Sequence, residues 1–181
     1  MPEFALNEVA EDLGLAVGSV YHFFPSKEAL LIATAHRVEN KISNALNQED
    51  FTDFTCWQDV LRQASRRSVR TFNTSPAALR LFYGATGFAM VDRGGRRGSR
   101  RGSQAMARVL RRQFEIGFIE DLEGLIFRAT LITDSFWRDS VRQHGWIESG
   151  DVELSMDAAL AFCRLYIPTQ LKSASRPEIV A

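Results

Sequence analysis

The residues best suited to contact a nucleic acid lie close together near the N-terminus. Gly18 would let the backbone approach a base edge, and Ser19 offers a small hydroxyl. Tyr21 and His22 can hydrogen-bond to a phosphate, and Lys27 places a positive charge where a long helix is expected to begin. An exposed, solvated helix surface is the alternative interpretation. The predicted DNA-contacting set is Val17, Gly18, Ser19, Tyr21, His22 and Lys27.

Two short helices and one long helix are expected to position these residues. Apolar residues recur at helical spacing over 6–13, and Gly14 follows, where a helix end favours a left-handed residue. A second short helix is predicted over 17–23. Ser26 is a good N-cap for a long helix that should run to about Leu46. The pattern is that of a helix-turn-helix joined directly to a scaffold helix.

This segment resembles the signature of the TetR family of bacterial transcriptional regulators. The resemblance covers about 26 of the 181 residues and runs through Val9-Ala10, Leu13-Gly14-Leu15, Gly18-Ser19-Val20-Tyr21-His22-Phe23-Phe24 and Pro25-Ser26-Lys27-Glu28-Ala29-Leu30-Leu31. It implies that Tyr21 contacts a phosphate and that Phe23 packs between the recognition helix and the long helix. It also implies a dimer that binds a palindromic operator on double-stranded DNA and responds to a small-molecule effector, most simply as a cytoplasmic repressor.

The head departs from the family pattern in three ways. Only two helices fit before Pro25, whereas the family has three, so the first helix is expected to be missing and Phe23 to lose part of its cover. Ala5 and Ala16 stand where Ser or Thr usually caps the short helices. Residues 1–47 carry three Lys/Arg against six Asp/Glu, and this net charge of −3 opposes phosphate binding.

Three explanations for the short head remain open: a true start upstream, a truncation, or a natural short form. A natural short form would imply an alternative function, that of a dimeric ligand-binding module whose DNA binding is impaired or lost.

Helical patterns continue through the rest of the chain, and no segment shows sustained strand alternation. The expected fold is all-α, a truncated helix-turn-helix head joined to a helical bundle. The predicted domains are a head over 1–46, an effector-binding and dimerisation bundle over 47–168, and a loose tail over 169–181. The expected helices of the bundle cover about 56–73, 76–91, 103–121, 122–143 and 151–167.

An arginine-rich segment interrupts this pattern. Residues 62–112 carry thirteen arginines and one acid. Within them, residues 92–103 hold four glycines and five arginines, which predicts a solvated loop rather than a helix. A nonspecific phosphate contact through residues 93–101, or attraction to an acidic surface, are the alternatives.

By family resemblance, the helices from about 56 to 121 should enclose an effector pocket, and the last two long helices should pair in a homodimer. Such a pocket would be apolar and aromatic and would suit an apolar or amphipathic effector, with Arg108, Arg111 or Arg112 facing any anionic group. The expected interface residues are Phe136, Trp137 and Phe162. The expected pocket residues are Phe72, Phe82, Phe88, Met106, Phe114 and Phe118.

Composition excludes several other classes. No apolar run approaches 18 residues and no signal peptide is expected, which argues against a membrane protein. Cys56 and Cys163 are far apart and predicted to be reduced thiols. With three scattered histidines and no nucleophile motif, neither a metal site, nor a cofactor, nor an enzyme is expected.

Overall fold

The computed structural model describes residues 5–84 and 87–174, and over 87–99 it describes the backbone alone. The described chain is helical throughout, with no strand beyond a single bridge between Phe114 and Ser173. The all-α prediction is confirmed. The helices are α1 Leu6–Asp12, α2 Val17–Phe23, α3 Lys27–Gln48, α4 Trp57–Asn73, α5 Pro76–Tyr83, α6 Gly87–Gln113, α7 Leu122–His144 and α8 Ser149–Cys163.

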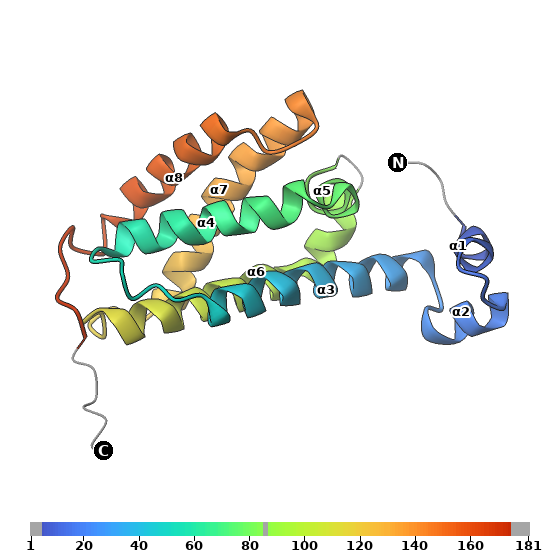
Figure 1. Cartoon of the computed structure of the whole chain (residues 1–181), viewed down its shortest axis with the longest axis horizontal. Helices are drawn as coiled ribbons and strands as arrows, with labels where there is room; N and C mark the ends of the chain where they lie inside the picture. Colours follow the sequence, from blue (N-terminus) through green and yellow to red (C-terminus); the bar gives the residue numbers. More distant parts are fainter. Residues whose placement is uncertain (1–4, 85–86, 175–181) are drawn as a thin grey trace, which may run out of the picture.

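One long helix connects the two parts of the molecule. The short helices α1 and α2 lie at the beginning of α3, beyond the end of the bundle (Figure 1). From there α3 runs into the bundle beside α6, and α4, α7 and α8 stack over this pair (Figure 1). The later half of α3 therefore belongs to the bundle, because Ile42 and Leu46 pack into its core.

Local capping signals fix most helix boundaries where the sequence predicts them. Gly14 has a φ of +62°, the left-handed conformation expected after α1. The Ser26 hydroxyl accepts a hydrogen bond from the Ala29 amide at 3.2 Å, and the Ser75 hydroxyl caps α5 in the same way. Ala5 and Ala16 stand at the N-caps of α1 and α2, and their methyl side chains accept no hydrogen bond, as expected. At α1 the Glu8 carboxylate accepts a hydrogen bond from the Ala5 amide at 2.9 Å.

The loop predicted for residues 92–103 is wrong, because α6 runs through it without a break. Arginine is a good helix former, and four glycines cost only about 4 kcal/mol in total. Packing repays this cost. Arg101 donates to the Asn40 side chain of α3 at 3.1 Å, the Arg100 guanidinium lies 5.0 Å from the ring centroid of Phe127, and Ser103 is buried.

The helix predicted over 76–91 is also wrong, since α5 ends at Tyr83. Gly84 follows in an extended conformation, and a Cβ there would collide with the carbonyl oxygen of Arg80. Only glycine fits this close approach without a shift of the backbone. The next described residue, Gly87, begins α6.

The helix expected to reach residue 121 ends earlier, at Gln113, because the chain there pairs with the C-terminal segment. The Glu115 amide donates to the Lys172 carbonyl at 2.8 Å, and the Ala174 amide donates to the Gln113 carbonyl at 2.9 Å. The indole of Trp57 donates to the Pro168 carbonyl at 2.9 Å. Residues 169–174 are thus held against the bundle rather than loose, whereas 175–181 lie outside the described residues.

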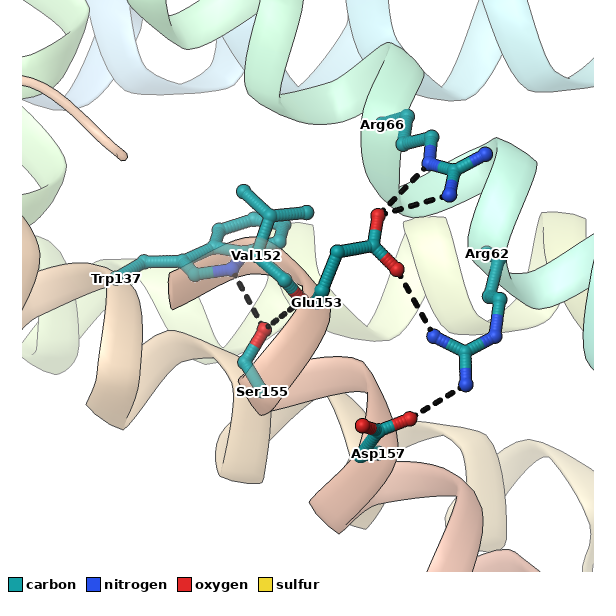
Figure 2. Close-up of polar contacts among 7 residues, drawn as sticks. All are labelled: Arg62, Arg66, Trp137, Val152, Glu153, Ser155 and Asp157. Carbon is teal, nitrogen blue, oxygen red and sulfur yellow. Dashed lines mark hydrogen bonds and ion pairs between the residues drawn. The ribbon is translucent and has the colours of Figure 1, made fainter. Parts of the chain in front are cut away.

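Two kinds of polar contact join α8 to the bundle (Figure 2). On the surface, Arg62 pairs with Glu153 at 3.0 Å and with Asp157 at 2.5 Å, and Arg66 pairs with Glu153 at 2.8 Å. In the interior, the indole of Trp137 donates to the Ser155 hydroxyl at 3.0 Å. The interior hydrogen bond contributes about 0.5–1.5 kcal/mol and an exposed ion pair about 0–1 kcal/mol, so both kinds of contact help to hold α8 in place.

Candidate functional site

A very small apolar core holds the head together. Leu6 and Ala10 of α1 bury against Val20 of α2, with Phe24 and Leu30 packed around them. Through Leu30, the start of α3 also contacts this core. This packing leaves the opposite side of α2 free to face a partner.

The predicted DNA-contacting residues are only partly on that free side, because Val17 lies one turn before the buried Val20 and Lys27 lies on α3. Val17, Gly18, Ser19, Tyr21 and His22 are all exposed on α2. Gly18 has open space where a Cβ would stand, so its backbone is accessible. Lys27 is half-buried at the first turn of α3 and already has an interaction within the chain. The structure therefore brings these residues to one end of the molecule, on two successive elements.

Acidic groups surround this surface. Glu8, Glu11 and Asp12 lie on α1, and Glu28 lies in the first turn of α3. Backbone amides at the helix start and the Ser26 hydroxyl lower the pKa of Glu28, so its carboxylate stays charged. These negative charges oppose phosphate binding. Among the described head residues 5–34, Lys27 is the one lysine or arginine that offsets them.

The head also exposes apolar surface. Phe23 was expected to pack between α2 and α3, and that expectation is wrong because its side chain is 74% exposed. Leu13, Leu15, Val17 and Tyr21 are exposed as well. The inward-facing residues of the two short helices leave no place for Phe23, whose ring touches only that of His22 among the ring contacts of the described residues.

Two short helices at a left-handed glycine turn, with the second helix exposed, form a helix-turn-helix, an arrangement that many DNA-binding proteins use. The comparison with known families agrees: residues 1–34 match the model for bacterial regulatory proteins of the tetR family. This match confirms the resemblance found in the motif and supports membership of the TetR family, whose members are DNA-binding transcriptional regulators. No curated protein and no solved structure matches the chain significantly.

Two further features bear on the class of protein. None of the helices in the described part of the chain is both long and apolar enough to cross a membrane. Over the same residues, no group of three or more histidine, cysteine or acidic side chains is arranged to hold a metal ion.

A second candidate site is a cavity of about 160 Å³ inside the bundle. Its wall is mostly apolar, with aromatic rings of Phe72, Tyr83 and Trp137 in edge-to-face contact beside it. Every helix from α3 to α8 contributes to the wall. The polar wall residues are Glu39, Ser43, Ser65, Ser68, Tyr83, Ser103, Thr130, Thr133 and Asp134.

Half of the predicted pocket residues line this cavity. Phe72, Phe82 and Met106 do so. Phe114 does not, because it packs under the C-terminal segment, and Phe118 does not, because it is 60% exposed in the turn after α6. The side chain of Phe88 lies outside the described residues.

The arginines expected to face an anionic ligand point elsewhere. Arg108, Arg111 and Arg112 are exposed and none lines the cavity, and Arg111 pairs with Glu123 at 3.5 Å. The charged wall residues are acidic instead. Glu39 was not predicted, although the sequence carries a signal: it interrupts the apolar face of α3 between Ala35 and Ile42.

The two acids in the cavity wall differ in how they are satisfied. Asp134 accepts a hydrogen bond from the Tyr83 hydroxyl at 3.1 Å. Burial raises its pKa to about 6, opposed by that hydrogen bond and by the charge of Arg138. Burial also raises the pKa of Glu39 to about 7, with only the charge of Arg101 in opposition. Both Glu39 carboxylate oxygens are buried without a hydrogen-bond partner.

The predicted interface residues are largely interior to the protomer. Trp137 is only 4% exposed and lines the cavity, so its assignment as an interface anchor is wrong. Phe136 is half-buried against the aromatic cluster. Phe162 is half-buried on α8, where its ring contacts Tyr166, and it retains an exposed edge.

Proposed function

We propose that the protein is a ligand-responsive repressor that binds a palindromic operator as a homodimer and releases it when a small molecule fills the bundle cavity. One observation carries this proposal: α3 connects the two sites. Lys27 begins α3 beside the recognition helix, and Glu39 of the same helix lines the cavity. Twelve residues separate them, about 18 Å along the helix axis.

A ligand acts through this helix only if it favours one of two positions of the heads. Moving a two-state equilibrium from 1:99 to 99:1 takes about 5.5 kcal/mol of differential binding. Because the cavity wall combines residues of α3 with residues of α4 to α8, a bound ligand can shift α3 against the rest of the bundle. The distance between the two heads of the dimer would then change and would no longer match the spacing of the operator half-sites.

The dimer is supported by an apolar stripe on the outer face of α8 and the turn that follows it. Leu154 of α8 is 56% exposed, and Leu165, in the turn after α8, is 75% exposed. Ala158, Ala161 and Phe162 lie between them at helical spacing. Apolar side chains in such a row are the usual sign of a helix–helix interface. The small alanines at its centre would let two helices approach closely.

The alternative, a dimeric ligand-binding module with impaired DNA recognition, is favoured by the acids around the α2 surface and by the exposure of Phe23. A titration of the full chain with a labelled duplex from upstream of its own gene distinguishes the two. Repressor function predicts binding that weakens linearly in log[salt]. The alternative predicts no binding above that of an unrelated duplex.

Gly18→Glu tests whether α2 is the contact surface. The new side chain has open space, so the fold should persist while a carboxylate faces the DNA. We expect affinity to fall at least about tenfold, or 1.4 kcal/mol. Gly117→Glu, also in open space but in the turn after α6, is the matched control. Equal losses from both variants would contradict the assignment.

A further inference from the structure

The carboxylate of Glu39 is the least satisfied charged group in the described cavity wall. Its residue is 6% exposed, and neither oxygen has a hydrogen-bond partner. A buried charge without a partner is among the costliest arrangements in a protein. It lies on α3, which packs along α6, and it faces the cavity from one side.

The surrounding groups do not neutralise it. Arg101 of α6 favours the charged form of Glu39 through its charge, but its guanidinium donates to Asn40 at 3.1 Å. Asp134 and Tyr83, the other titratable wall residues, are bonded to each other. Glu39 therefore remains available to a positive group that enters the cavity.

Two unpartnered hydroxyls in the wall extend this acceptor site. Ser43 lies one helical turn after Glu39 on α3, and Ser65 lies on α4, and the oxygens of both are buried without a partner. A primary ammonium has three N–H donors. The cavity wall thus offers as many unpartnered acceptor side chains as such a group has hydrogens.

The rest of the wall suits an apolar body. Phe72 and Trp137 supply aromatic faces or edges, and Met106, Met156 and Ile126 supply aliphatic surface. The volume of about 160 Å³ is close to that of an engineered apolar cavity that binds benzene, about 150 Å³. A carboxylate or phosphate ligand would face Glu39 with like charge, which excludes the anionic effectors.

We infer that the cavity binds a small primary amine with an apolar body about the size of one ring, and that its ammonium pairs with Glu39. This inference rests on the proposed function, because it names the chemistry of the effector for the cavity that we propose as the effector site. It also explains how binding reaches the DNA: the pairing residue stands on the helix that carries the head.

Three probes of equal size and different charge test the inference: benzylamine, benzyl alcohol and benzoate. Titration calorimetry with the full chain at pH 8 should show benzylamine binding at least tenfold tighter than benzyl alcohol, and benzoate not binding. In the Glu39→Gln variant, the affinity for benzylamine should fall at least tenfold, while the affinity for benzyl alcohol should be unchanged. Asp134→Asn, the other cavity acid, should keep most of the preference for the amine.

Several outcomes would overturn the inference. They are equal binding of amine and alcohol, an amine preference that survives Glu39→Gln, or no binding of any probe at millimolar concentration. Circular dichroism and thermal unfolding check that each variant is folded. If Glu39→Gln fails to fold, Ser65→Leu replaces it, because a larger side chain in the cavity should block the amine while leaving the acid in place.

A separate measurement keeps this inference distinct from the proposed function. Benzylamine is added to the complex of protein and upstream duplex. Glu39-dependent amine binding without any effect on DNA binding would support the amine site and contradict the repressor. Release of DNA by a neutral or anionic compound alone would support the repressor and contradict the amine site.

Discussion

At the residue scale, the proposed function depends on one buried acid without a hydrogen-bond partner and on exposed residues with room for DNA. Glu39 is buried in an apolar wall without a hydrogen bond, and Gly18 and Ser19 are exposed at the far end of the molecule. A stable fold alone favours neither arrangement, because an unpaired buried acid destabilises it. We expect Glu39 to act when a ligand enters the cavity, and Gly18 and Ser19 to act when DNA contacts α2.

The stability of the protein should fall as pH rises through the raised pKa of Glu39. The folded-state pKa is about 7 against 4.5 for the free side chain, so the folded state holds the proton more tightly. The contribution of Glu39 to the free energy of unfolding is therefore highest below about pH 4.5. It falls between about pH 4.5 and 7 and is constant above pH 7. Asp134, with a pKa of about 6, adds the same trend at lower pH.

Glu39→Gln should remove the Glu39 part of this fall, which lies between about pH 4.5 and 7, and should leave little change in stability between pH 6 and 7. At pH 8 the variant should be more stable than the wild type by about 1–3 kcal/mol, because a buried charge becomes a neutral amide. Urea unfolding at pH 5, 6, 7 and 8 measures this. A wild type whose stability does not change with pH across this range would contradict the burial of Glu39 as a charge.

At the element scale, α6 shows that packing decides the state of a segment whose composition favours a loop. Its first half is rich in glycine, yet it continues the helix that buries Ala105, Met106 and Leu110. Before that buried stretch, Arg101 already donates to Asn40 of α3. The helix is therefore weak in its own sequence and depends on its neighbour.

Glycine replacement tests this account. Gly102 lies within α6 and has open space for a Cβ, so Gly102→Ala should stabilise the protein by about 0.5–1 kcal/mol. Gly84→Ala is the matched control, and it should destabilise because the new Cβ meets the Arg80 carbonyl. Thermal unfolding should show a higher unfolding temperature for Gly102→Ala and a lower one for Gly84→Ala. Stabilisation by both would contradict the described end of α5.

At the scale of the whole molecule, α3 joins the head to the bundle, so the proposed response to an effector requires a displacement of this helix. The head core is small, and Leu30 is the residue of α3 that packs against it. The bundle end of α3 is held by Ile42 and Leu46 in the main core. In the proposed mechanism, a rigid α3 between the small head and the larger bundle would convert a small shift at Glu39 into a larger displacement of α2.

The dimer belongs to this scale as well. Leu154→Glu should shift the protein toward a monomer in light scattering, because it places a charge in the apolar stripe on α8. The matched control is Leu15→Glu, an equally exposed leucine of the head, which should leave the oligomeric state unchanged. A wild type that is monomeric at micromolar concentration would contradict the dimer.

The sequence alone determined what depends on local chemistry. Helix periodicity and caps at Gly14, Ser26 and Ser75 predict most helix boundaries, and the motif from Val9 to Leu31 predicts the class of the head, because these signals act within a few residues. Tertiary structure decided the rest. Whether 92–103 forms a helix and whether Trp137 faces inside or outside depend on neighbours far away in the chain, and no local pattern records them. The interrupted apolar face of α3 marks Glu39 in the sequence, but only the packing of the other helices makes it border a cavity.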